Sequence, residues 1–511
     1  MAEQPVPWPR SHLRVQPIIL DASARSLALP VTVLAAAVLA GMATAVVGDL
    51  FGYRAIYYVA VMGLIVIGSI VAATRAEPLR FVFLALIVCF PIANALVPPG
   101  RIGLTVFDVV MVALTIGLIG RKVLASSTAS GPLFPAKSLL VAWLLAIPCV
   151  VFSQYPVLSA HTFVLNFSVY VFFLFALSEL GRDGGLERLV ILFSIVLILM
   201  AVGLFIDHVL HVNLSMRGGN LNQLSYAGGR TIWRAGGFFQ DPQKAGAFLA
   251  SLITFLLLLS IRGRFRGMKL RFLVWAAAVA GLAALVTTIS RAAILACLLV
   301  SALALFAFNR WSAPAKLMGA GSLILVVMAW VLTPVEIWLD LVPATVSERF
   351  LQSRAEFENR LVIWLDTWEM FADHPLTGIG PGSFQPYLIE TRPTVFNYYG
   401  IGEAAGVAYV PDQPESGYLK ILYEGGIAGS LAVLLVVGDA LRRAIGVIAK
   451  GDAGAEARTE VIAALAGLVA FGATFVTLFT VSDARIGAVF ALFLAVIWYR
   501  SLQRARATPR A

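Results

Sequence analysis

The chain has 511 residues, 60% of them hydrophobic and only 13% charged, with a mean hydropathy of +0.88. Soluble proteins carry about 25% charged residues, so this composition excludes an ordinary soluble domain and predicts an all-α protein that crosses a membrane many times. The net charge of +10 does not indicate nucleic acid as a partner. Lys and Arg gather in short segments between apolar runs, where orientation in a bilayer requires them.

The chain begins with a polar, basic and proline-rich segment, residues 1–26, which is typical of a cytoplasmic tail and not of a signal peptide, because many apolar runs follow it. A helix needs about 20 mostly apolar residues to cross a bilayer. The sequence contains fourteen such runs. Twelve or thirteen crossings stay open as alternatives, because the run at 137–152 is short and the connection at 290–292 is barely a turn. The predicted runs lie near 27–47, 55–73, 79–97, 104–120, 137–152, 159–180, 186–207, 242–261, 271–290, 292–309, 315–334, 417–438, 460–480 and 484–499.

These runs divide the chain into an N-terminal tail, three groups of transmembrane helices, two large loops and a C-terminal tail. Their predicted bounds are 1–26 for the first tail, 27–208, 242–334 and 417–499 for the helices, 209–241 and 335–416 for the loops, and 500–511 for the last tail. Connections usually have about 4–6 residues, and a loop as long as 335–416 normally carries function.

Orientation follows from the basic residues. With the N-terminus in the cytoplasm, every strongly basic short loop falls on the cytoplasmic side, as the positive-inside rule requires, and these segments hold most of the 38 Lys and Arg residues. The 335–416 loop then lies on the outer side.

Ionisable residues in the apolar runs fall at the outer ends of their helices in this orientation. Such residues are costly in a membrane and usually functional, although each one alone can be a snorkelling or capping residue. The nearly charge-free middle disfavours an ion-coupled transporter and favours a site at the outer water–lipid interface. The residues are Asp108, Asp207, Lys244, Arg291, Lys420, Glu424 and Arg485.

Basic side chains surround the start of the 242–261 run. Arg230 and Arg234 lie in a glycine-rich part of the preceding loop, and Lys244 lies in the first turn of the helix. A helix N-terminus with basic side chains predicts an anion site.

Arg291 stands between two apolar runs, directly after Thr287-Thr-Ile-Ser290. Its partner is either a lipid headgroup or the diphosphate of a lipid carrier, whose oxygens a guanidinium binds bidentately.

The long loop contains a predicted helix. Arg354 and Glu358, and likewise Glu356 and Arg360, have the i,i+4 spacing of helical ion pairs. Arg360, Trp364 and Trp368 then share a face, which is either the solvated side of an amphipathic helix or a surface that meets a charged, lipid-linked substrate and its sugars.

Four segments together resemble the O-antigen ligase and O-antigen polymerase superfamily over roughly residues 230–435. They are Arg234…Gly236-Gly-Phe…Asp241-Pro-Gln, Arg291 after its Thr/Ser run, the Arg360-x-x-x-Trp364 helix with the turn Pro375-Leu-Thr-Gly-Ile-Gly-Pro-Gly-Ser-Phe384, and Tyr418-Leu…Tyr423-Glu-Gly-Gly-Ile-Ala-Gly429.

The resemblance implies a metal-independent, inverting membrane glycosyltransferase of the GT-C type. It takes a glycan from undecaprenyl diphosphate on the periplasmic face of the inner membrane. The family's two diphosphate-binding arginines correspond to Arg291 and Arg360, and Arg234, Lys244, Trp364, Trp368 and Asp412 are further substrate-binding candidates. Lipid-linked oligosaccharide, an acceptor glycan and membrane lipids are the expected partners, with polysaccharide-assembly proteins as further candidates.

The family's catalytic histidine is replaced here. Ligases read His-Asn-x-Tyr-Leu before their last helices, whereas this chain reads Glu415-Ser-Gly-Tyr-Leu. A carboxylate can act as general base where partial burial raises its pKa, and Asp412 is a competing base. The alternative is that Glu415 only caps the following helix.

The predicted function is a polymerase of lipid-linked oligosaccharide repeats, with a ligase to lipid A–core and a flippase of lipid-linked sugars as alternatives. No cofactor or metal is expected, because Asp207-His208-x-x-His211 lacks a third strong ligand.

Overall fold

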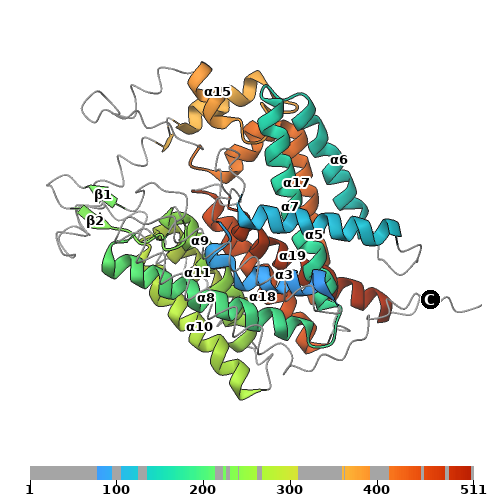
Figure 1. The fold of residues 1–511 in the computed structure, drawn as a ribbon, viewed down its shortest axis with the longest axis vertical. Coiled ribbons are helices and arrows are strands. Elements are labelled where there is room, and N and C mark those ends of the chain that lie inside the picture. The colour runs from blue at the N-terminus through green and yellow to red at the C-terminus, as the bar shows by residue number, and fades with distance from the viewer. Residues whose placement is uncertain are drawn as a thin grey trace, which may run out of the picture.

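The computed structural model describes residues 77–94, 105–124, 135–212, 214, 223–225, 231–239, 241–261, 267–308, 360–361, 363–391, 414–449, 454–477 and 483–507. Helices dominate these residues (Figure 1). Two short strands, β1 (Gln223–Ser225) and β2 (Thr231–Trp233), pair antiparallel within the predicted 209–241 loop, with Gln223 opposite Trp233. They lie at the left of Figure 1.

Seven of the described helices are long and apolar enough to cross a membrane, which confirms a multi-pass helical membrane protein. They are α7 (Pro156–Leu180), α8 (Gly185–Leu210), α9 (Pro242–Ile261), α10 (Met268–Thr287), α17 (Gly417–Ala449), α18 (Ala455–Phe475) and α19 (Ala484–Ala507). Shorter apolar helices are α3 (Pro78–Val88), α4 (Phe90–Ala93), α5 (Val106–Leu124), α6 (Lys137–Val151) and α11 (Arg291–Phe308).

The runs predicted at 27–47, 55–73 and 315–334 lie outside the described residues, so fourteen crossings stay a prediction, as do the predicted domain bounds. One predicted run is interrupted. The run at 79–97 divides into α3 and α4 at Cys89. Pro91 follows in the first turn of α4, a position where its missing N–H costs nothing.

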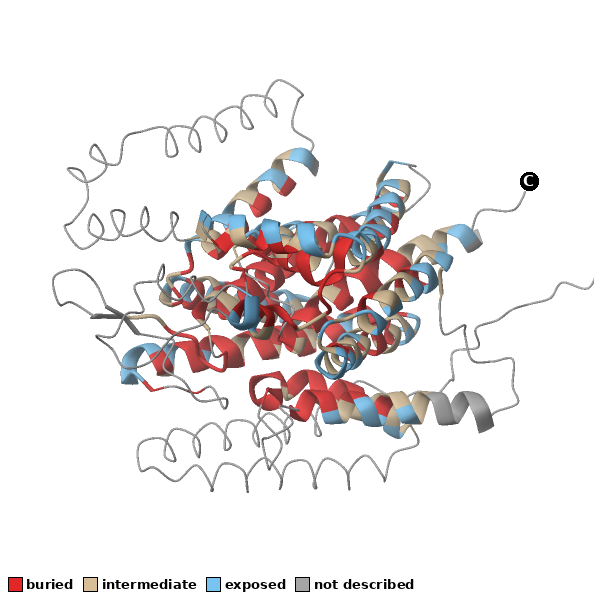
Figure 2. Ribbon diagram, turned by 90° about the horizontal axis from the view of Figure 1, so that it is seen from above, coloured by how far each residue is buried: buried red, intermediate tan, exposed pale blue. Residues whose placement is uncertain are grey.

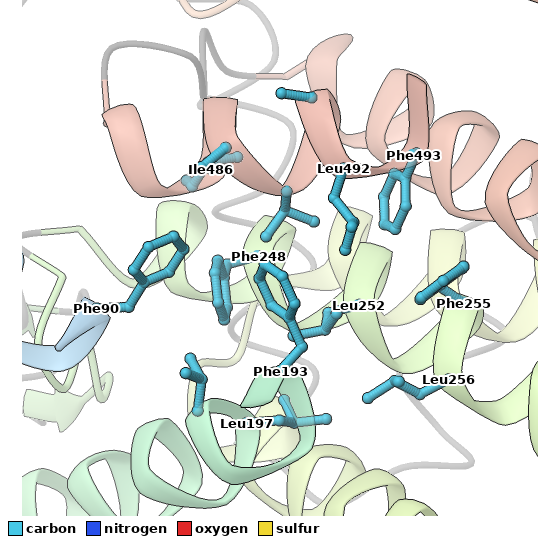
Figure 3. Close-up of a cluster of buried hydrophobic side chains, with 14 of the residues drawn as sticks. Phe90, Phe193, Leu197, Phe248, Leu252, Phe255, Leu256, Ile486, Leu492 and Phe493 are labelled. Atoms are coloured by element: carbon cyan, nitrogen blue, oxygen red, sulfur yellow. The ribbon is translucent and has the colours of Figure 1, made fainter. Parts of the chain in front are cut away.

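The core is built around α9, which packs against α18, α10 and α11, and α19 packs against both α9 and α7. The residues of α9 are apolar on nearly every side, as expected of a helix surrounded by others. Phe248 and Leu252 of α9 meet Phe193 of α8 and Leu492 of α19 in one cluster (Figure 3). Buried residues accordingly concentrate in the middle of the bundle (Figure 2).

Ion pairs join helices at one end of the bundle, which we call the basic end. The Glu179 carboxylate accepts hydrogen bonds from Arg80 at 2.8 Å and Arg188 at 2.6 Å, joining α7 to α3 and α8. Glu460 of α18 likewise pairs with Arg500 of α19, at 2.7 Å from Arg500 Nη2. Three of the basic residues predicted to face the cytoplasm therefore lie at this end.

Candidate functional site

The loop 374–383 inserts into a break in α17 at the opposite end of the bundle, which we call the loop end. In an unbroken helix, the N–H groups of Ile427 and Ala428 would bond the carbonyls of Tyr423 and Glu424, four residues earlier. Here Ile427 N donates to Pro375 O at 2.8 Å and Ala428 N to Leu376 O at 3.0 Å. The vacated Tyr423 and Glu424 carbonyls accept Ile379 N at 3.2 Å and Gly380 N at 2.9 Å. Four bonds to the loop thus replace two bonds of the helix.

Two glycines make this close approach possible. Gly426 in α17 has φ 58° and Gly378 in the loop has φ 67°. Both angles lie in the left-handed region, which residues other than glycine rarely adopt. A Cβ on Gly378 would lie 2.4 Å from the Glu424 carbonyl carbon, and one on Gly426 would lie 2.5 Å from Gly378 N. Any side chain at either position would therefore push the loop out of the break.

The turn between α6 and α7 holds the loop from the other side. Ser153 Oγ donates to Ile379 O at 2.9 Å, and Gln154 N donates to the same oxygen at 3.0 Å. The Cys149 thiol donates to Gly425 O at 3.2 Å. The loop is therefore clamped between α17 and the α6–α7 turn.

A buried ion pair on α17 contacts the C-terminal end of the docked loop. Lys420 Nζ lies 2.9 Å from Glu424 Oε1 on α17, and both side chains are less than a tenth exposed. The same Glu424 oxygen accepts Phe384 N at 3.3 Å, at the first residue of α15 (Phe384–Thr391). A carboxylate at a helix N-terminus is stabilised by the helix dipole. The Lys420–Glu424 pair therefore helps to hold the loop against α17.

A small second core lies beneath the loop, separate from the main one. Its buried side chains are Ile363, Met370, Ile379, Phe384, Tyr387, Leu388 and Tyr423. The first two come from a helical segment that is described over residues 360–361 and 363–373, which we call the loop helix. Tyr423 comes from α17, so this core ties the loop helix to the membrane-spanning helix.

The structure brings two of the predicted catalytic residues together. Arg360 Nη2 at the start of the loop helix lies 3.5 Å from Glu415 Oε2, two residues before α17. Each side chain is about a quarter exposed. Glu415 has φ 51°, a conformation that non-glycine residues rarely adopt and that is enriched at active sites and ligand-binding sites. Asp412, the competing base, lies outside the described residues.

The two tryptophans of the loop helix differ in exposure. Ile363, Thr367 and Met370 form its buried face. Trp364 is half-buried, whereas Trp368 is exposed, with its ring centre 5.4 Å from that of Phe371.

A second group of predicted residues surrounds the turn between α10 and α11. Arg234 Nε donates to Thr288 O at 3.2 Å, and Ala235 N donates to Thr287 O at 3.1 Å, so the 233–237 segment lies against this turn. Arg291 is the exposed first residue of α11. Lys244 lies in the first turn of α9, which meets the same turn because a Cβ on Gly246 would lie 2.8 Å from Ser290 Cβ.

Asp207 positions this second group. Its buried carboxylate accepts Trp233 Nε1 at 2.6 Å, Gly236 N at 2.9 Å and Gly237 N at 2.6 Å. These three donors hold the segment that carries Arg234. The carboxylate is thus occupied by the protein itself, and within the described part of the chain no three His, Cys, Asp or Glu residues are grouped as a metal would require.

The Arg360–Glu415 pair and the second group, with Arg234, Lys244 and Arg291, lie on different sides of one end of α18. This helix packs against α9, α11 and α17. Tyr418 of α17 donates its hydroxyl to Gly472 O of α18 at 2.8 Å. The Arg360–Glu415 pair therefore lies on the α17 side of this helix end, and Arg291, Arg234 and Lys244 lie on its α9 and α11 side.

Sequence reasoning missed the docking of the loop and the part played by Asp207. It also missed the partner of Arg485, a fully buried residue that binds Asp483 at 2.6 Å and the Phe238 carbonyl at 3.2 Å. One signal for the docking was present. Glycines alternate at 378, 380 and 382, and a further Gly pair interrupts the apolar run at 425–426.

Fold and site together define a multi-pass helical membrane protein whose loop-end site carries cations and a carboxylate. Residues 276–434, less than half of the chain, match the family model described as O-Antigen ligase. This match confirms the resemblance to the O-antigen ligase and polymerase superfamily and supports a membrane enzyme of that type. It includes Arg291, Arg360 and Glu415 but neither Arg234 nor Lys244. A search of curated proteins found no match.

Proposed function

We propose that the protein is an inverting, metal-independent glycosyltransferase that polymerises undecaprenyl-diphosphate-linked oligosaccharide on the periplasmic face of the inner membrane. The observation that carries this proposal is the ion pair between Arg360 and Glu415. A cation suited to a diphosphate and a carboxylate suited to a general base lie side by side where the long loop enters α17.

The proposed reaction has one displacement step. An acceptor sugar hydroxyl attacks the anomeric carbon of the lipid-linked glycan and forms the new C–O bond. The bond from that carbon to the diphosphate oxygen breaks, and the carrier diphosphate leaves with the electron pair. The hydroxyl proton passes to the Glu415 carboxylate, which must come within hydrogen-bond reach of it.

The ion pair also suggests an order of events. A diphosphate carries more charge than a carboxylate and binds a guanidinium bidentately. Its arrival therefore competes with Glu415 for the Arg360 guanidinium. In this way binding of the donor substrate weakens the ion pair that engages the base.

Arg291, Arg234 and Lys244 supply positive charge on the other side of the α18 end. Preorganised cations stabilise the charge that develops on a leaving group. We assign this role to Arg291 foremost, with Arg234 and Lys244 beside it. Arg291 directly follows the α10–α11 turn, Arg234 bonds to that turn, and the start of α9, which carries Lys244, packs against it at Gly246. Trp364, the half-buried tryptophan of the loop helix, is assigned to the sugars.

The test uses purified protein in liposomes with carrier-linked repeat units as the sole glycan. A polymerase produces longer carrier-linked glycans from these units alone, and Arg360→Ala abolishes the product. If product forms only after lipid A–core is added, the protein is a ligase. If neither condition yields product while labelled carrier crosses the bilayer, the enzymatic proposal is wrong and the flippase alternative holds.

A further inference from the structure

The loop helix is apolar on two opposite faces. One face, with Ile363, Thr367 and Met370, is buried against the second core. The opposite face, roughly 180° away on a helix of about 3.6 residues per turn, carries Leu361, Leu365, Trp368 and Ala372, all of them exposed. Leu365 is 65% exposed and Trp368 is 56% exposed.

A helix on the surface of a water-soluble domain normally carries polar residues opposite its buried face. Here the acidic residues lie along one edge between the two faces, at Asp366, Glu369 and Asp373. The pattern is that of a helix in contact with two apolar environments, of which the protein core supplies only one.

The exposed apolar surface of α17 leads directly to this helix. Ile427 and Leu431, just after the break in α17, are exposed apolar residues of a membrane-crossing helix. Leu376 adjoins them, because its carbonyl accepts Ala428 N at 3.0 Å, and it is 69% exposed. Only two residues, His374 and Pro375, separate Leu376 from the end of the loop helix at Asp373.

The α6–α7 turn adds to the exposed apolar surface formed by Leu376, Ile427 and Leu431. Phe152 and Val157 are exposed on either side of Ser153 and Gln154, which bond the loop at Ile379. The segments on both sides of the docked loop therefore present large apolar side chains outward at the loop end of the bundle.

We propose that the exposed face formed by Leu361, Leu365, Trp368 and Ala372 lies in the lipid–water interface of the membrane leaflet at the loop end. Arg360 at the start of the helix then lies at the level of the phosphate headgroups, where a cation is attracted to anionic groups. An interfacial helix of this kind buries its apolar face roughly 5–10 Å into the headgroup and acyl boundary. This inference concerns where the helix lies and holds or fails independently of the proposed glycosyl transfer.

The test places one environment-sensitive fluorophore on the full chain in lipid nanodiscs, after Cys89, Cys149 and Cys297 are replaced. The label is attached at Leu365→Cys on the exposed apolar face and, as the matched control, at Asp373→Cys on the acidic edge of the same helix. Both positions are exposed, so neither substitution disturbs the core. Quenching is measured with brominated lipids and with aqueous iodide, and size-exclusion profiles verify folding.

The label at residue 365 is expected to be quenched severalfold more by brominated lipid than by iodide, and the label at residue 373 is expected to show the reverse preference. Equal quenching by iodide at both positions would overturn the proposal, because the face would then be in water. Protection of residue 365 from both quenchers would overturn it as well, because another part of the chain or a second copy would then cover the face.

Discussion

Arg360 and Glu415 are separated by 55 positions in the chain, yet Arg360 Nη2 lies 3.5 Å from Glu415 Oε2. The loop helix reaches this position because Ile363 and Met370 anchor it on the second core, and Glu415 reaches it because α17 begins two residues later. The pair marks the point at which the loop and the membrane-spanning helices meet, and the main predictions concern residues around it.

Removal of either arginine proposed to bind the diphosphate should abolish transfer. We expect Arg291→Ala and Arg360→Ala to leave the protein folded, because both side chains are partly or fully exposed. Arg→Lys should rescue poorly, because a point charge cannot reproduce the bidentate fork. The measurements are glycan length in a complementation assay and binding of carrier lipid by purified protein. Arg442→Ala, at an exposed site near the other end of α17, is the control, and wild-type glycans from both Ala variants would refute the role.

Glu415 should act through its carboxylate. Glu415→Gln is expected to lower the transfer rate by about 10²-fold or more, the typical contribution of a general base, while carrier-lipid binding persists. Glu415→His should restore part of the rate, because an imidazole can accept the same proton. Glu390→Gln changes a carboxylate bound to Tyr155 and serves as the control.

Glu415→Gly separates catalysis from backbone strain. Glycine tolerates φ 51° without cost, so this variant should be at least as stable as the wild type and yet inactive.

Full activity in Glu415→Gln together with loss of activity in Asp412→Asn would move the role of general base to Asp412.

The two neighbouring glycines of α17 should respond differently to alanine. Gly426→Ala forces a side chain into a left-handed conformation, which costs about 1–3 kcal/mol, and places its Cβ against Gly378 N. Its Tm in detergent and its transfer rate should both fall. Gly425→Ala meets only Ser430 N at 4.0 Å and should be tolerated. Equal behaviour of the two variants would show that the docking of the loop does not depend on this close approach.

Asp207 should act as a positioning residue for Arg234. Asp207→Ala leaves three donors without their acceptor, at a cost of about 1–3 kcal/mol for each buried group, whereas Asp207→Asn keeps one acceptor oxygen. The Tm should therefore fall more for Ala than for Asn. Both variants should weaken carrier-lipid binding to the extent that Arg234→Ala does, and unchanged binding in Asp207→Ala would contradict the positioning role.

The orientation can be tested without any activity. A topology reporter inserted near Gly400 should lie outside the cell membrane and one near Gly267 inside, because basic loops are retained in the cytoplasm. Both reporters on the same side would invalidate the predicted topology and the periplasmic site with it.

The sequence by itself located most of the membrane-spanning helices that the structure describes. The predicted run at 242–261 has the bounds of α9, and the run at 186–207 differs from α8 by only a few residues at either end. An apolar run long enough to cross a bilayer becomes a helix whatever its neighbours are, because only internal hydrogen bonds can satisfy its backbone in lipid. The family was also recognisable from short motifs in their order along the chain.

Only the tertiary structure decided how those motifs meet. The break in α17 is stable because the carbonyls of Pro375 and Leu376 replace those of Tyr423 and Glu424, and neither segment alone indicates the exchange. The three donors to Asp207 come from a segment that follows it by 26 to 30 residues. Hydropathy is a property of one segment and can be read locally. A hydrogen bond between distant segments depends on how several helices pack, and that information is spread over the whole chain.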